Sequence, residues 1–165
     1  MEILELLRGL VKPGAGENLV DIVSPFQFVL AWAPEKRISK FSCHKLIAQE
    51  LVDILEDVLL RARVEVKKVH GYDKTTSFYD EEVARLLKKT RLNRFGGCFN
   101  YRTKRSNPQA LSVHSWGIAI DIDPEFNGLG NQKPTIPSWF VDAFEAKGWV
   151  WGGRWSGKGT DPMHF

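Results

Sequence analysis

Two histidines and two aspartates in the C-terminal third of the chain have types and spacings that suit a metal-dependent hydrolytic site. His114 and Asp121 occur close together, and Asp161 precedes His164 by three positions. Zinc accepts imidazole nitrogen and carboxylate oxygen, and a catalytic zinc site keeps one position open for water. His114, Asp121 and His164 are therefore candidate ligands. Asp161 is a candidate general base, which would take a proton from water.

Spacing alone is a weak signal, so the elements that would position these side chains matter. Residues 117–123 predict a strand, on which Asp121 and Asp123 share one side with Ala119. Acids on a cleft-facing side need a partner, and a metal supplies one. His114 would lie on the turn that enters this strand. Pro162 would stiffen the turn between Asp161 and His164.

The rest of the chain predicts alternating helices and short strands. Apolar spacing predicts a helix over 42–60 capped by Ser42, and another over 80–89 capped by Asp80. Further elements are strands at 64–69 and 149–151, an extended segment at 99–102, a turn at 96–97 and a helix at 138–147. We expect an α+β fold in which a small antiparallel sheet has flanking helices.

The first forty residues are harder to interpret. An amphipathic helix is expected over 2–11, and Pro25 and Pro34 then interrupt an apolar, aromatic stretch. This region could be an arm, a linker or part of the core. We expect an N-terminal arm or extension over 1–40 and a domain over 41–165 that carries the candidate metal site.

Composition sets broad limits. A chain of 165 residues with 43% hydrophobic residues is expected to form one domain, and we expect a monomer. No stretch is apolar enough to span a membrane. The net charge of +3 is only a weak bias toward anionic surfaces, and no nucleic-acid partner is expected. The basic residues over 85–105 predict a solvated face, with a wall polymer or a peptide carboxylate as the alternative partner. The first twelve residues do not resemble a secretory signal, so we expect synthesis in the cytoplasm. A substrate outside the cytoplasm would then need another export route, such as phage-type release or delivery.

The two cysteines offer a different chemistry. No CxxC pair is present, so a cysteine-based zinc site is not expected. Cys43 is expected in the core. Cys98 follows two glycines and could be a nucleophile, although a small buried hydrophobic residue is the favoured interpretation.

Three sequence blocks carry a family resemblance. The block Ser112-x-His114-x-x-Gly117-x-Ala119-x-Asp121 closely resembles the signature of the D-Ala-D-Ala carboxypeptidase and L-alanyl-D-glutamate peptidase family, whose metal site is related to those of lysostaphin and the hedgehog domain. The segments 97–102 and 149–165 are similar to the blocks that precede and close this signature. The resemblance covers roughly residue 40 to the end. It implies a zinc peptidase domain over 41–165 with a hedgehog/D-Ala-D-Ala-peptidase-like fold.

The resemblance also implies residue roles. His114, Asp121 and His164 would bind Zn²⁺, and Asp161 would activate water and later protonate the leaving amine. Arg102 would stabilise the oxyanion or hold a substrate carboxylate, because a guanidinium offers a planar set of donors.

Several residues near these positions could support the site. Gln109 and Ser112 are candidates for orienting ligands or binding the substrate backbone, although Ser112 could instead cap a turn. Asp123 could bond to a ligand histidine or begin the turn at Pro124. Trp149 and Trp151 are expected in the core, whereas Trp155 is a candidate cleft residue.

The implied substrate is the peptide part of bacterial peptidoglycan. The expected activity is that of a phage-type L-alanyl-D-glutamate endopeptidase, either an endolysin or a tail-associated enzyme. One alternative is a D-Ala-D-Ala carboxypeptidase or dipeptidase. Others are a non-catalytic, zinc-stabilised binding module and a cysteine hydrolase that uses Cys98.

Overall fold

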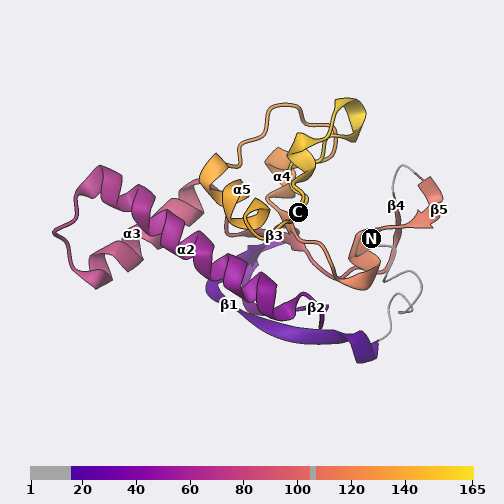
Figure 1. Ribbon diagram of the computed structural model, residues 1–165, viewed down its shortest axis with the longest axis horizontal. Coiled ribbons are helices and arrows are strands. Elements are labelled where there is room, and N and C mark those ends of the chain that lie inside the picture. Colours follow the sequence, from indigo (N-terminus) through magenta and orange to yellow (C-terminus); the bar gives the residue numbers. More distant parts are fainter. Residues whose placement is uncertain (1–15, 105–106) are drawn as a thin grey trace.

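The computed structural model describes residues 16–104 and 107–165, and its centre is a four-stranded sheet with strand order β2-β1-β3-β6 (Figure 1). The strands are β1 (Leu19–Leu30), β2 (Ala33–His44), β3 (Arg94–Gly97) and β6 (Asp121–Ile122). The pairs β1–β2 and β3–β6 are antiparallel, whereas β1 and β3 are parallel. The α+β class expected from the sequence is confirmed, with this one parallel pair inside the sheet.

The long hairpin β1–β2 belongs to the core. Side chains on one face of the hairpin, including Phe28 and Cys43, are fully buried. Of the three possibilities for the first forty residues, the described part is therefore integral to the sheet. The boundary expected after residue 40 falls inside β2. The helix expected over 2–11 lies outside the described residues.

Two helices, α2 (Ala48–His70) and α3 (Thr76–Lys89), project together from one side of the sheet (Figure 1). The strand expected at 64–69 is wrong, because α2 continues through it. Val66 extends the buried face of α2, so packing on that face overrides the strand preference of valine. Both expected caps are also wrong. Ser42 lies in β2, and Thr75 caps α3 by accepting a hydrogen bond from the backbone N–H of Phe78.

The C-terminal half is built from short elements. These are β4 (Thr103–Lys104), β5 (Asn107–Leu111), α4 (Pro124–Asn127), α5 (Ser138–Glu145) and the 3₁₀ turns η2 (Val113–Trp116), η3 (Gly152–Arg154) and η4 (Gly157–Gly159); a further 3₁₀ turn, η1 (Gly16–Asn18), precedes β1.

Several expected elements are shorter than the sequence pattern indicated. The strand expected over 117–123 shrinks to β6, because Gly117 takes the left-handed conformation at the end of η2. The strand expected over 149–151 is absent among the described strands. The expected turn at 96–97 belongs to β3, and the segment expected to be extended at 99–102 forms no described strand, since β4 begins at Thr103.

The end of the chain is held inside the molecule. Phe165 and Ile120 exchange two backbone hydrogen bonds of 3.0 and 3.1 Å, and the N–H of Ile122 donates to the carbonyl of Met163 at 2.8 Å. The Phe165 ring is buried, with its centroid 4.3 Å from that of Phe144. The C-terminus accordingly lies in the middle of the molecule in Figure 1. None of the described helices is long and apolar enough to cross a membrane.

Candidate metal centre and cleft

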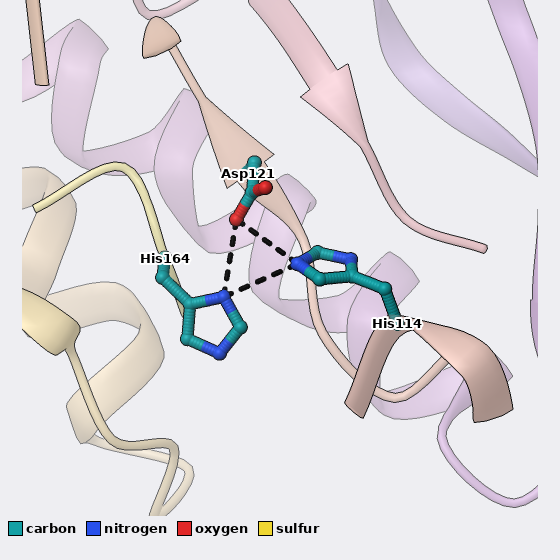
Figure 2. Close-up of side chains that lie close together, drawn as sticks. All are labelled: His114, Asp121 and His164. Carbon is teal, nitrogen blue, oxygen red and sulfur yellow. Dashed lines mark hydrogen bonds and ion pairs between the residues drawn. The ribbon is translucent and has the colours of Figure 1, made fainter. Parts of the chain in front are cut away.

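Three side chains from separate segments converge on one point (Figure 2). His114 comes from η2, Asp121 from β6 and His164 from the C-terminal segment. The His114 Nε2 atom lies 3.2 Å from both Asp121 Oδ1 and His164 Nδ1, and His164 Nδ1 lies 3.1 Å from Asp121 Oδ1. The cluster is largely withdrawn from solvent, since His114 and Asp121 are buried. Three potential ligand atoms thus form a nearly equilateral triangle.

This triangle has the size that zinc requires. Two ligand atoms at about 2.0–2.1 Å from zinc, at the tetrahedral angle, are separated by about 3.4 Å. The three observed separations, 3.1–3.2 Å, are close to that value. One imidazole presents Nε2 and the other Nδ1, and the carboxylate presents one oxygen. This donor set fits zinc with a fourth position left for water.

The hydrogen bond at His114 Nδ1 determines which form of the Nε2 atom faces the triangle. His114 Nδ1 lies 2.8 Å from the carbonyl oxygen of Cys98, which can only accept, so Nδ1 donates. In the neutral ring, Nε2 then carries a lone pair toward the triangle. A carboxylate oxygen and a second imidazole nitrogen face that lone pair. Such an arrangement needs a cation at its centre, either a proton or a metal ion.

The electrostatics at Asp121 agree with a site built for positive charge. Burial on its own would raise the pKa of this carboxyl group. The hydrogen bonds and charges of His114 and His164 outweigh burial and hold the pKa of Asp121 well below its ordinary value. Asp121 is therefore an anion in the folded protein, and a buried anion requires a compensating positive charge.

Two glycines allow the close backbone packing that brings His114 and Asp121 to the candidate metal centre. Gly117 ends η2 with φ +69°, and a Cβ there would lie 3.0 Å from the backbone nitrogen of His44. Gly96 lies against β6, where a Cβ would lie 2.8 Å from the Cβ of Asp121. These close approaches leave no room for a side chain. Ser112 caps η2 and its oxygen accepts from the backbone N–H of His114, so the interpretation of Ser112 as a turn cap is correct.

A third glycine ties Asp161 to His164. The Gly152 N–H donates to the His164 carbonyl at 2.8 Å, and the Gly152 carbonyl accepts from the Asp161 N–H at 2.9 Å. The N–H of His164 in turn donates to the carbonyl of Asp161 at 3.0 Å. The candidate base and the third candidate ligand therefore share one backbone scaffold.

The centre opens into a cleft of about 760 Å³. The expected site residues found on its wall are Arg102, Ser112, His114, Trp155, Asp161 and His164. The Trp155 ring centroid lies 5.5 Å from that of His164, and 43% of Trp155 is exposed. Gln109 is exposed in β5 and is not among the described residues of this wall.

Hydrogen bonds to the backbone of Arg102 fix its position, while its guanidinium can still contact a substrate. Its N–H donates to Ser115 Oγ at 3.0 Å, the hydroxyl of Ser115 donates to its carbonyl at 2.8 Å, and the Ser112 N–H donates to the same carbonyl at 2.9 Å. The guanidinium contacts the carbonyl of Thr103 at 3.3 Å. No ion pair involves it among the described residues.

Sequence reasoning missed part of the cleft. Glu50, on the first turn of α2, lines the wall and accepts a 2.7 Å hydrogen bond from Trp149 Nε1. Trp149 was expected in the core, and it instead packs against the core and also lines the cleft. Trp151 is in the core as expected. The spacing of Glu50 within a helix gave no signal of its role, because only the tertiary fold brings α2 beside residue 149.

Two further residues have structural settings that differ from a catalytic role. Asp123 is fully buried and lies at the start of α4. Its carboxylate accepts a hydrogen bond from Arg91 Nε at 2.8 Å, so the expected bond to a ligand histidine is not formed. The thiol of Cys98 is 1% exposed and lies 3.7 Å from the carbonyl of Gly117. Burial raises the pKa of that thiol well above its ordinary value, which disfavours the nucleophilic thiolate.

Comparison with known proteins finds one family model that matches the segment carrying this site. Residues 105–165, which include all three members of the triangle and Asp161, match the D-alanyl-D-alanine carboxypeptidase family. No curated protein and no solved structure matches the chain. The matched segment supplies the candidate ligands in the order that the sequence blocks predicted. The C-terminal segment of this chain, residues 105–165, is thus similar to the D-alanyl-D-alanine carboxypeptidase family.

Proposed function

We propose that the protein is a zinc-dependent peptidase that hydrolyses amide bonds in the peptide part of bacterial peptidoglycan. The observation that carries the proposal is the triangle of His114 Nε2, Asp121 Oδ1 and His164 Nδ1, with sides of 3.1–3.2 Å, at the base of a cleft that Asp161 also lines. These three atoms would hold the zinc ion. When bound, zinc polarises a carbonyl group and lowers the pKa of water to about 7.

The side chains around the cleft have separable tasks. Asp161 would take a proton from the attacking water and pass it to the leaving amine, as a half-buried carboxylate beside the proposed ligands can do. Arg102 would stabilise the negative charge that develops on the carbonyl oxygen, or hold a substrate carboxylate. Trp155, beside His164, offers an aromatic surface to the substrate.

For the bond that is cut, we propose the L-alanyl-D-glutamate linkage, as in phage-type endopeptidases of an endolysin or a tail. The alternative is removal of terminal D-Ala by a carboxypeptidase or dipeptidase. The basic residues Lys104, Lys147 and Lys158 line the cleft without an ion-pair partner among the described residues. They favour an acidic peptide such as one that contains D-glutamate. We further propose a monomer that reaches the wall after phage-type release or delivery.

Incubation with purified wall fragments tests this function. Mass analysis of the products should reveal new L-Ala carboxyl and D-Glu amino ends, and a chelator should abolish their formation. Release of D-Ala alone would instead support the carboxypeptidase. Asp161→Ala should retain zinc and lose hydrolysis. A protein that binds zinc and wall peptides but never cleaves them would support the non-catalytic binding module.

A further inference from the structure

We propose that Asn127 is a positioning residue that sets the separation of Asp121 and His164. This inference rests on the proposed role of those two residues as metal ligands. Asn127 ends α4 and is fully buried, yet it touches neither candidate ligand directly. Its importance lies in the segments that it joins.

The side chain of Asn127 is saturated with hydrogen bonds. Its Nδ2 donates to Asp123 Oδ2 at 3.1 Å and to Thr135 Oγ1 at 2.9 Å, and its Oδ1 accepts from the Thr135 N–H at 2.8 Å. A buried amide with this many partners is strongly fixed in orientation, since any rotation would leave buried polar atoms unsatisfied. The side chain therefore anchors the end of α4 to the residue two positions beyond Asp121.

The main chain of Asn127 reaches the other ligand-bearing segment. Its carbonyl accepts from the Met163 N–H at 2.7 Å, and the Met163 carbonyl accepts from the Ile122 N–H at 2.8 Å. Met163 is thus held on both sides, by β6 and by α4. His164 is the next residue and forms an antiparallel β-bridge with Asp121. The Asn127 carbonyl therefore adds a backbone hydrogen bond beside the pairing that aligns His164 with Asp121.

The partner of Asn127 is itself tightly constrained. Asp123 is fully buried and has φ +48°, in the left-handed region that residues other than glycine adopt infrequently. Arg91 Nε donates to its Oδ1 at 2.8 Å, and its own N–H donates to the Arg94 carbonyl at 2.8 Å. Asn127 completes this set of restraints by binding the remaining carboxylate oxygen.

Loss of the Asn127 amide should therefore loosen the triangle without removing any ligand. Residues that orient metal ligands through hydrogen bonds typically change metal affinity by about 10- to 100-fold when they are mutated. For Asn127→Ala we expect Co²⁺ affinity, measured by titration of the metal-free protein, to weaken about tenfold. The visible absorption of bound Co²⁺ should also shift, since it reports ligand geometry.

A matched control separates positioning from general destabilisation. Val83 is buried in α3, away from the cleft, and Val83→Ala should lower Tm while leaving Co²⁺ affinity and absorption unchanged. Both variants are measured at a temperature at which circular dichroism shows them folded. Equal Co²⁺ affinity and spectra in Asn127→Ala and Val83→Ala would overturn the inference.

An exchange of the two side chains provides a second test. Asn127→Asp alone places two carboxylates together and should weaken Co²⁺ binding. The double variant Asp123→Asn with Asn127→Asp restores a donor and an acceptor at the pair, so binding should recover at least in part. No recovery in a folded double variant would count against the inference. If the wild-type protein bound no Co²⁺, the proposed function itself would fail.

Discussion

Gly152 and Asp161 approach so closely that a Cβ on the glycine would lie 2.3 Å from the carbonyl oxygen of Asp161. Gly152→Ala must therefore displace the segment that carries both Asp161 and His164. Because misplacement of a catalytic group by about 1 Å can cost about 100-fold in rate, we expect kcat to fall by about 10- to 100-fold. Steady-state hydrolysis of a wall peptide measures this change.

The same loop offers a control for that substitution. A Cβ on Gly159 would have no heavy atom within 4 Å, and its φ is not in the left-handed region. Gly159→Ala should leave kcat and zinc content close to those of the wild type. Equal activities for the two alanine variants would mean that the close approach at Gly152 does not constrain the catalytic segment.

The depressed pKa of Asp121 predicts how acid affects the metal-free protein. The carboxylate is stabilised in the folded state relative to the unfolded state, where its pKa is about 3.9. Its contribution to stability is present above that pH and is lost as the pH falls toward the folded pKa. Urea unfolding with a chelator should show wild-type stability falling below about pH 4. Asp121→Asn should show a smaller fall over that range, and an identical fall would contradict the assignment.

The convergence of His114, Asp121 and His164 was easier to predict than the segments that carry them. His114, Asp121, Asp161 and His164 were identified because their residue types and motif spacing are local properties of the sequence. The extent of α2 was not predicted, because the valines near its end have a strand preference. Packing on the buried face of the helix overrides that preference.

Long-range contacts explain the other differences. The close approach of Glu50 to Trp149 depends on how α2 crosses the C-terminal loops, and no local pattern encodes it. No local pattern encodes the contacts of Asn127 either. Thr135 follows an irregular loop, and Met163 is distant along the chain. Gln109, by contrast, was suggested by its position near the motif, and the geometry of β5 exposes it to solvent.

The buried thiol of Cys98 predicts insensitivity to alkylation. Because the pKa of this thiol is raised by burial and its side chain is 1% exposed, iodoacetamide should leave hydrolysis unchanged under native conditions. A chelator should abolish the same activity. Activity that persists with the chelator and disappears on alkylation would instead support a cysteine hydrolase.

The cleft lysines Lys104 and Lys158, which have no ion-pair partner within the described part of the chain, predict a preference for anionic substrates. Lys104→Glu and Lys158→Glu should each raise KM for a peptide with free carboxylates several-fold, with little change for the same peptide carrying carboxamides. Added salt should reduce the difference between the two peptides, since screening weakens exposed charges. Lys133→Glu serves as the control, because Lys133 is exposed and is not among the described residues that line the cleft. Equal changes for both peptides would exclude charge recognition by these lysines.

Phe165 is expected to be essential for both the fold and the metal centre. Its ring is 3% exposed and packs against Phe144 and Trp151, so Phe165→Ala should reduce the free energy of unfolding by about 3–5 kcal/mol. Its neighbour His164 should bind zinc less tightly, because the pairing with Ile120 would lose its buried anchor. Val150→Ala is a suitable control, since 62% of Val150 is exposed and its loss should cost little stability. Thermal unfolding with and without zinc measures both effects: the zinc-dependent rise in Tm should shrink for Phe165→Ala alone, and an undiminished rise would show that the anchor does not support His164.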